Sequence, residues 1–315
     1  MLETTWFVLW GLLWAVYFVL DGFDFGMGTL LPFLAKNDEE KRIIYNAAGP
    51  YWDGNEVWLI TAGGVTFAAF PKAYAVMFSA LYAPLLILLF ALIFRAVSFE
   101  FRNKKDCPQW RKFWDACQFL GNFLPALLLG VAFANLFMGI PIDGNGVYHG
   151  NIIKLLNPYG LAGGIFFVLI FCMHGALWLA LKSEGDIHER AVGAAQVVWP
   201  LVLAVALLFL ALTAFYTNLY ANYAEHPTLL VFPILAVASL LTVRVMIWAD
   251  NLLGAWFFSA LFIITVTFFG VLGMYPGIII SSIDPAYSVT VFNGASSPLT
   301  LKIMLGVTLC CIPVV

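Results

Sequence analysis

Charged residues are scarce in this chain. Asp, Glu, Lys and Arg make up only 10% of its 315 residues, whereas a typical soluble domain carries about 25%. The hydrophobic share is 63% and the aromatic share 17%, and a soluble domain of this length could not bury so much apolar surface. The composition therefore excludes a soluble globular protein. The net charge of −3 argues against the basic surface that nucleic-acid binding needs, so a polytopic membrane protein remains.

Residues that bind haem or metal ions are also few. Only one of the four histidines, His174, lies inside an apolar run, and a lone helix histidine is more often a hydrogen-bonded core residue than an axial ligand. The five cysteines form no Cys-x-x-Cys pair. The sequence also lacks a histidine pair at i, i+4, a dinucleotide fingerprint, a Walker sequence and a serine nucleophile elbow. We therefore expect the chain to provide no catalytic residue, no metal ligand and no axial haem ligand.

Long apolar runs are abundant. A helix crosses the hydrocarbon core with about 20 mostly apolar residues, and the runs are continuous, unlike the short alternating segments of a membrane β-barrel. We therefore predict an all-α polytopic protein, a single integral membrane domain over residues 1–315, with two four-helix bundles plus one extra helix. The nine expected helices cover 5–34, 54–71, 74–97, 116–139, 159–181, 193–216, 228–248, 254–275 and 298–315.

Positive charge is distributed unevenly between the two sides of these helices. Of the 15 Lys and Arg residues, all except Lys72, Lys154 and Lys302 are expected at loops or helix ends on one side. Cytoplasmic loops carry the excess of such residues. We therefore expect the N-terminus outside, the 99–115 loop in the cytoplasm and, with nine helices, a cytoplasmic C-terminus. The 140–158 and 276–297 segments then form long outside loops.

Ionisable residues inside apolar runs are the main functional signal, because they are costly in lipid. Asp21 and Asp24 are three residues apart in the first run and so share a helix face. Gly22 and Gly26 form a small-xxx-small pair, which lets another helix backbone approach closely.

Three further ionisable residues are expected on the same side of the membrane. Asp53 and Glu56 share a face at the start of the second run, and Arg95 ends the third. Crowded carboxylates at low dielectric cannot all ionise without partners, so the group could carry protons from the cytoplasm, with Asp53 nearest the water. An equally open alternative is a structural network in which Arg95 neutralises Asp24 or Asp53. Glu56 could simply face the lipid headgroups.

The motifs around these residues resemble those of one family. The resemblance rests on the sequence DGFD at Asp21–Asp24 with Gly26, on GPYWDGNEVWL at 49–59, on Phe94-Arg95 and on LNPYG at 156–160. Together they are similar to subunit II of the cytochrome bd quinol oxidases, over essentially the whole chain. The family's chains normally run further, so the resemblance implies that the last helix is cut short here.

The resemblance implies a subunit of a quinol:dioxygen oxidoreductase, a terminal oxidase of the bacterial or archaeal cell (inner) membrane. Subunit I, the partner, would hold haem b, haem d and the quinol site. Subunit II would share its bundle-type fold, support it and bind no haem axially. Protons for the reduction of dioxygen to water would come from the cytoplasm. Small accessory single-helix subunits, a lipid or a quinone are further partners that such a complex could hold, and nucleic acid is not among them.

The resemblance also assigns roles to individual residues. It places Asp53 at the cytoplasmic entrance of a proton path that continues with Asp24, Asp21 and Glu56. It makes Arg95 and Asp24 a polar network near the partner's haems. A proton-coupled secondary transporter is the alternative that the buried carboxylates leave open, although the inverted repeats and broken helices of such transporters are not recognisable. A purely structural anchor is the third hypothesis.

Overall fold

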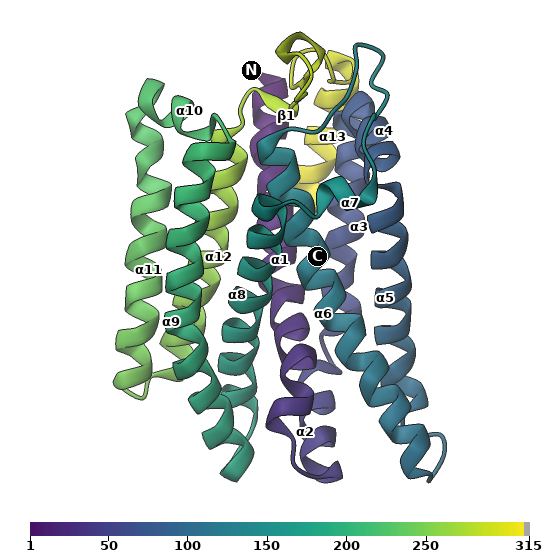
Figure 1. Cartoon of the computed structure of the whole chain (residues 1–315), viewed down its shortest axis with the longest axis vertical. Coiled ribbons are helices and arrows are strands. Elements are labelled where there is room, and N and C mark those ends of the chain that lie inside the picture. The colour runs from purple at the N-terminus through teal and green to yellow at the C-terminus, as the bar shows by residue number, and fades with distance from the viewer. Residues whose placement is uncertain (312–315) are drawn as a thin grey trace.

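The computed structural model describes residues 1–311, and most of them are helical (Figure 1). The all-α membrane class predicted from the apolar runs is therefore confirmed. The α-helices are α1 (Leu2–Leu34), α2 (Asp38–Ala48), α3 (Trp52–Ala69), α4 (Pro71–Ala80), α5 (Tyr82–Phe101), α6 (Pro108–Met138), α7 (Ile152–Leu155), α8 (Pro158–Lys182), α9 (Gly185–Tyr216), α10 (Leu219–Glu225), α11 (Val231–Trp248), α12 (Leu252–Gly273) and α13 (Pro298–Cys311). Short 3₁₀ turns η1 (Pro227–Leu230) and η2 (Pro285–Tyr287) and strands β1 (Gly277–Ile279) and β2 (Val289–Thr290) complete the chain.

The expected count of nine membrane spans is not confirmed by the length and composition of the helices. Within the described residues, seven helical segments are long and apolar enough to cross a bilayer: α1, α5, α6, α8, α9, the segment Pro227–Trp248 and α12. Helix α3 matches the second expected run and α13 the ninth, but residues 312–315 of the ninth lie outside the described part. A count of nine therefore stays a prediction.

The expected helix at 74–97 is broken. Helix α4 ends at Ala80 and α5 begins at Tyr82. Pro84, in the first turn of α5, has no amide hydrogen, and its ring would clash with the carbonyl of the residue four positions earlier, Ala80. The proline therefore favours the break at this point, with Leu81 as the residue between the two helices.

Several helices also extend further than expected. The 99–115 segment, expected to be a cytoplasmic loop, is mostly helical, because α5 continues to Phe101 and α6 begins at Pro108. Helix α9 likewise begins at Gly185 instead of residue 193. Hydropathy detects only the part of a helix that lies in hydrocarbon, whereas these helices continue as polar turns beyond it.

The helices form two groups of four in the described chain, as predicted. Helices α1, α3, α5 and α6 pack together, as do α8, α9, α11 and α12, and α13 packs against α1. Helices α1 and α6 both contact α8, and α1 also contacts α12, so these two helices join the two groups. Figure 1 shows the N-terminus, α10, β1 and α13 at one end of the molecule, and α2 with the α5–α6 and α8–α9 turns at the other.

The contact between α1 and α8 depends on glycine. A Cβ added to Gly26 would overlap the carbonyl oxygen of Phe171, and one added to Gly175 would lie 2.5 Å from the amide nitrogen of Met27. Gly22 faces the ring of the same Phe171. The small-xxx-small pair therefore brings the two backbones into direct contact, as expected.

The two long loops at the N-terminal end pack on each other. The amide of Ile140 donates to the carbonyl of Ile280 over 2.9 Å, and the Ser281 hydroxyl donates to the carbonyl of Ile142 over 2.7 Å. Strands β1 and β2 pair within the second loop. These loops therefore form an ordered cap, which the turn-rich sequence did not predict.

Candidate functional site

Arg95 is the centre of a buried ion cluster formed by α1, α3 and α5. Its guanidinium is fully buried and lies 2.8 Å (Nη1 to Oδ1) and 3.1 Å (Nη2 to Oδ2) from the two carboxylate oxygens of Asp21, which is also fully buried. Nη2 lies 2.5 Å from Oε1 of Glu56. The guanidinium also stacks over the Phe25 ring, 4.7 Å from its centroid. One arginine therefore holds two carboxylates from two helices.

This pairing corrects two expectations. Arg95 lies inside α5 instead of ending the helix. Its partners are Asp21 and Glu56, and neither Asp24 nor Asp53 neutralises it by direct contact. Asp21 and Asp24 share a face of α1, but they differ by about 4.5 Å in height along the helix. Of these two carboxylates, only Asp21 contacts the guanidinium.

Asp24 is buried on the same face but has a neutral partner. Its Oδ2 accepts a hydrogen bond from Nδ2 of Asn55 over 2.8 Å, and Asn55 also donates to the carbonyl of Leu20 over 2.9 Å. Oδ1 of Asp24 has no hydrogen-bond partner in the described chain. Asn55 belongs to the motif that carried the resemblance, but sequence reasoning gave it no role.

The four carboxylates differ in their access to solvent. Asp53 is exposed in the first turn of α3. One turn further along α3, the Glu56 side chain is 24% exposed and contacts Arg95, so it does not simply face the headgroups. Asp21 and Asp24 are buried. The carboxylates therefore form a series from the surface at the α2 end into the interior.

A second ion cluster, formed by α2, the end of α5 and α6, was missed by sequence reasoning. Nε of Arg102 lies 2.6 Å from Asp115, its Nη2 lies 2.6 Å from Asp38, and Nζ of Lys41 lies 2.8 Å from Asp115. We name these four residues the surface cluster. Arg102 is almost fully buried, although it was expected in a loop. Its position seven residues after Arg95, which puts both on one face of a helix, was the available signal.

The surface cluster predicts a pH dependence of stability. Burial acts to raise the pKa of Asp38, but the hydrogen bond from Arg102 and the nearby cations outweigh it and hold the pKa below its usual value. A carboxyl whose pKa is lowered in the folded state stabilises it fully above about pH 4, and this contribution is lost as the pH falls through the lower folded pKa. The thermal unfolding midpoint of Asp38→Asn, measured between about pH 5 and pH 3, should therefore fall less steeply than that of the wild type. Glu39→Gln, which keeps the Arg102 contact, is the control, and equal slopes for all three proteins would contradict the prediction.

His174 lies in the core, as its surroundings in the sequence suggested. Nδ1 lies 2.6 Å from Oγ of Ser259 and Nε2 lies 3.1 Å from the carbonyl of Val19. The ring also stacks on Trp256. Both ring nitrogens are thus engaged within the chain, which leaves neither free to bind a haem iron.

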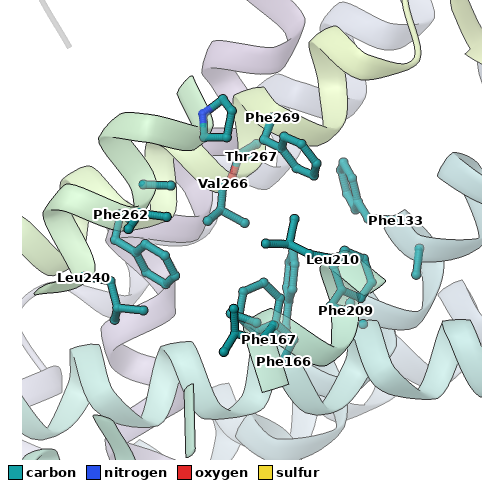
Figure 2. Close-up of a pocket in the computed structure, with 18 of the residues that line it drawn as sticks. Phe133, Phe166, Phe167, Phe209, Leu210, Leu240, Phe262, Val266, Thr267 and Phe269 are labelled. Carbon is teal, nitrogen blue, oxygen red and sulfur yellow. The ribbon is translucent and has the colours of Figure 1, made fainter. Parts of the chain in front are cut away.

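An apolar cavity of about 120 Å³ lies among α6, α8, α9, α11 and α12. Figure 2 shows phenylalanine rings on several sides of it, among them Phe133, Phe166 and Phe262. Thr267 contributes one of its few polar atoms, and no titratable residue lines it in the described chain. This cavity can hold an apolar group but has no acid, base or iron ligand.

A larger groove of about 610 Å³ lies on the other group of helices, between α3 and α5. Its walls include Ile60, Phe67 and Leu89, whose side chains are more than half exposed. Gly63 and Gly64 on α3 have open space beside them. One wall of the groove is formed by α3, the helix that carries Asp53 and Glu56.

Comparison with known proteins gives a consistent result. The family model described as cytochrome bd terminal oxidase subunit II matches residues 2–315. Cytochrome bd ubiquinol oxidase subunit 2 of Bacillus subtilis (strain 168) is 37% identical, over 100% of this chain and 92% of its own. Cytochrome bd-I ubiquinol oxidase subunit 2 of Escherichia coli (strain K12) is 35% identical, over 100% and 91%.

A solved structure matches the fold. A chain of the bd oxidase from Geobacillus thermodenitrificans superposes with a TM-score of 0.80, and the match covers 99% of this chain and 94% of that one. The sequence identity is 16%, so this match concerns the fold alone. The helical arrangement described above is therefore one that a bd oxidase chain adopts.

Proposed function

Because this chain belongs to the family of cytochrome bd terminal oxidase subunit II, we propose that it supports the haem-bearing subunit I and supplies a proton path to it from the cytoplasm. The complex is a membrane oxidoreductase of the bacterial respiratory chain. The observation that carries the proposal is the series of carboxylates from exposed Asp53 to buried Asp24. Family membership favours this function over a proton-coupled secondary transporter.

The series has the properties of a relay. Asp53 and Glu56 are one turn apart on α3, about 4.5 Å along its axis, and Glu56 meets Asp21 through Arg95. The cluster of Asp21, Asp24 and Glu56 contains three carboxylates but one guanidinium, so charge balance in a low-dielectric interior favours binding of protons there. Asp24 is buried beside the Asp21–Arg95 pair, and its unpartnered Oδ1 can accept a proton.

The distribution of cations supports a cytoplasmic origin for these protons. Apart from Lys72, Lys154 and Lys302, the Lys and Arg residues lie toward the end of the molecule that carries α2 and Asp53. That end is therefore the cytoplasmic one. The N-terminus then lies outside, and a chain that ends after a ninth span has its C-terminus in the cytoplasm.

We place subunit I on the face formed by α3 and α5. Large apolar side chains are exposed along the groove, and Gly63 and Gly64 would let a partner helix approach closely. Glu56, which is part of a charged cluster, is partly open on the same helix. A charge that faces lipid is costly, and a protein partner removes this cost. The buried acids would then deliver protons across this interface.

Cytochrome bd oxidases carry haems and use quinol. We assign haem b, haem d and the quinol site to subunit I, because the residues of this chain do not fit an axial role: both nitrogens of His174 are already bonded. The cavity of Figure 2, which is lined by phenylalanine and leucine, suits the apolar tail of a lipid or a quinone.

Replacing the outermost carboxylate tests the proton path. Asp53→Asn removes the group that takes up protons while keeping its size. We expect oxygen reduction by the purified complex to slow by about tenfold or more, which corresponds to about 1.4 kcal/mol of barrier. Reduced-minus-oxidised haem spectra should be unchanged.

Asp250→Asn is the matched control. Asp250 is exposed at the same end of the molecule, in the turn between α11 and α12, and asparagine tolerates its positive φ. This variant should turn over at the wild-type rate. Wild-type turnover in Asp53→Asn, with intact haem spectra, would remove Asp53 from the path.

A further inference from the structure

Arg244 is a cation in the membrane-spanning segment Pro227–Trp248, and no acidic residue of the described chain pairs with it. Of the six arginines, four form ion pairs with acidic residues, namely Arg95, Arg102, Arg111 and Arg190. The fifth, Arg42, is exposed on α2 and so can face water. An uncompensated charge in an apolar segment is costly and is a functional signal by default. The surroundings of Arg244 therefore indicate what meets this charge.

A proline on α9 explains why the side chain of Arg244 reaches that helix. Pro200 has no amide hydrogen, so it cannot donate the usual helix hydrogen bond to the carbonyl of Gln196, four residues earlier. Nη1 of Arg244 donates to this carbonyl over 3.2 Å. In the opposite direction, Nε1 of Trp199 on α9 donates to the carbonyl of Leu240 on α11 over 2.7 Å. These two bonds hold the guanidinium between α9 and α11.

Two tryptophan rings flank the guanidinium. Its Cζ lies 4.8 Å from the ring centroid of Trp248 and 5.6 Å from that of Trp199, and a cation over an indole face is stabilised. Arg244 is four residues, about 6 Å, from the end of α11, where tryptophan and arginine side chains reach the lipid headgroups. A guanidinium has five N–H donors, and within the described chain Arg244 makes only the bond to Gln196. The remaining donors can bind an anion.

The apolar cavity of Figure 2 begins one helical turn from this guanidinium. Leu240, which lines the cavity, is one turn before Arg244 on the same face of α11. On α9 the lining extends from Leu203, one turn after Trp199, to Leu210, which is about 10 Å further along the helix. Helices α9 and α11 contact each other much less than α9 contacts α8 or α11 contacts α12. The space between α9 and α11 is therefore cationic at the cytoplasmic end and apolar beyond it.

We propose that this space binds one anionic phospholipid of the cytoplasmic leaflet. We name it the α9–α11 lipid site; it consists of Arg244, Trp199 and Trp248 at the headgroup end and the cavity of Figure 2 at the chain end. The phosphodiester accepts two parallel hydrogen bonds from the guanidinium and supplies the missing negative charge. One acyl chain fills the cavity, where its burial is favourable.

The charge of the site selects this occupant over other lipids. A quinone is neutral, and a zwitterionic phospholipid carries its own cation beside the phosphate, so neither compensates Arg244 fully. The inference deepens the proposed function, in which the cavity holds an apolar tail, and it rests on the cytoplasmic orientation proposed there. With subunit I on the face formed by α3 and α5, the helices α9 and α11 of the other group remain open to lipid.

Retention of lipid by the purified heterodimer tests the site. The delipidated complex is titrated in detergent with phosphatidylglycerol or with phosphatidylcholine of the same chain length, and the bound lipid is counted by native mass spectrometry. We expect the wild type to retain one more phosphatidylglycerol than Arg244→Gln, whose affinity for this lipid should be about tenfold lower. Glutamine can still donate to the Gln196 carbonyl, so the charge alone is tested. Arg244→Lys should retain the lipid, and phosphatidylcholine should not replace it.

Arg42→Gln is the matched control, because it removes one cation from the same end of the molecule outside the site. It should retain phosphatidylglycerol as the wild type does. Ala236→Leu partly fills the cavity and should lower retention although Arg244 is intact, with unchanged haem spectra as evidence that the complex is folded.

Four results would overturn the lipid site. They are equal retention in the wild type and Arg244→Gln, equal losses in Arg42→Gln and Arg244→Gln, wild-type retention in Ala236→Leu, and binding of phosphatidylcholine or a quinone in place of phosphatidylglycerol. The measurement is bound lipid and not turnover. Its failure would therefore leave the Asp53 path standing, and wild-type turnover in Asp53→Asn would leave the lipid site standing.

Discussion

Replacement of Arg95 by leucine is expected to prevent stable assembly of the oxidase. The guanidinium is fully buried and contacts both Asp21 and Glu56. Removal of one partner from a buried ion pair costs about 3–5 kcal/mol, because the remaining charge has no compensation. A folded protein is stable by only about 5–15 kcal/mol in total. We therefore expect a much lower yield of haem-containing complex, measured from the absorption spectrum of the detergent-solubilised complex. We also expect a lower unfolding midpoint, measured by thermal melting.

Two further variants separate the causes of this effect. Arg95→Lys keeps the charge but loses the fork that binds both oxygens of Asp21, so its stability should be intermediate. Arg95→Leu combined with Asp21→Asn and Glu56→Gln removes all three charges, and it should regain part of the yield, because the unpaired carboxylates are the source of the cost. Wild-type yield and melting in Arg95→Leu alone would show that the ion pairs do not hold the helices together. The triple variant also tests the relay, since recovered assembly without oxygen reduction separates proton transfer from scaffolding.

The fold was predictable in outline because a helix that spans a membrane requires a long hydrophobic run, which is visible in the sequence. Each apolar run is helical in the described residues, the third as the two helices α4 and α5, and the two groups of four are present. The ends of the helices were not predictable in this way, because Pro108–Asp115 is polar although it is helical. The break before Pro84 was not predictable from the proline alone, because Pro125 and Pro200 lie inside the unbroken helices α6 and α9. The paired loops at the N-terminal end depend on contacts between distant segments, as between Ile140 and Ile280, which no local pattern reveals.

The candidate site was predictable as a set of charges but not as a network. Helix periodicity shows which side chains share a face, but it does not show which residue of a neighbouring helix stands at the same height. For this reason the sequence suggested Asp24 or Asp53 as the partner of Arg95, and the structure has Asp21 and Glu56. A neutral polar residue was missed for another reason. Asn55 barely lowers the hydropathy of its helix, although it donates a hydrogen bond to Asp24.

Replacement of Gly26 by alanine is expected to have the largest effect of any single added methyl group on α1. The new Cβ would overlap the carbonyl oxygen of Phe171. The α1 backbone fixes the position of the Cβ and the oxygen belongs to the α8 backbone, so neither can move by changing a rotamer. Overpacking of this kind costs about 1–3 kcal/mol, and more where the backbone must shift. Separation of α1 from α8 would also displace Asp24, two residues away, and Asp21 on the same helix. We therefore expect a lower unfolding midpoint and slower oxygen reduction together.

A glycine without close neighbours provides the comparison for this effect. Gly193 in α9 has no atom within 4 Å of an added Cβ in the described chain, and alanine is the better helix former by about 1 kcal/mol. Gly193→Ala should therefore melt at or above the wild-type temperature and keep full turnover. If Gly26→Ala behaved like Gly193→Ala, the direct backbone contact between α1 and α8 could not be what fixes the height of the buried carboxylates. If Gly26→Ala had a lower unfolding midpoint but full turnover, the buried carboxylates would tolerate a shift of α1. The series from Asp53 to Asp24 would then not depend on the alignment that the α1–α8 contact provides.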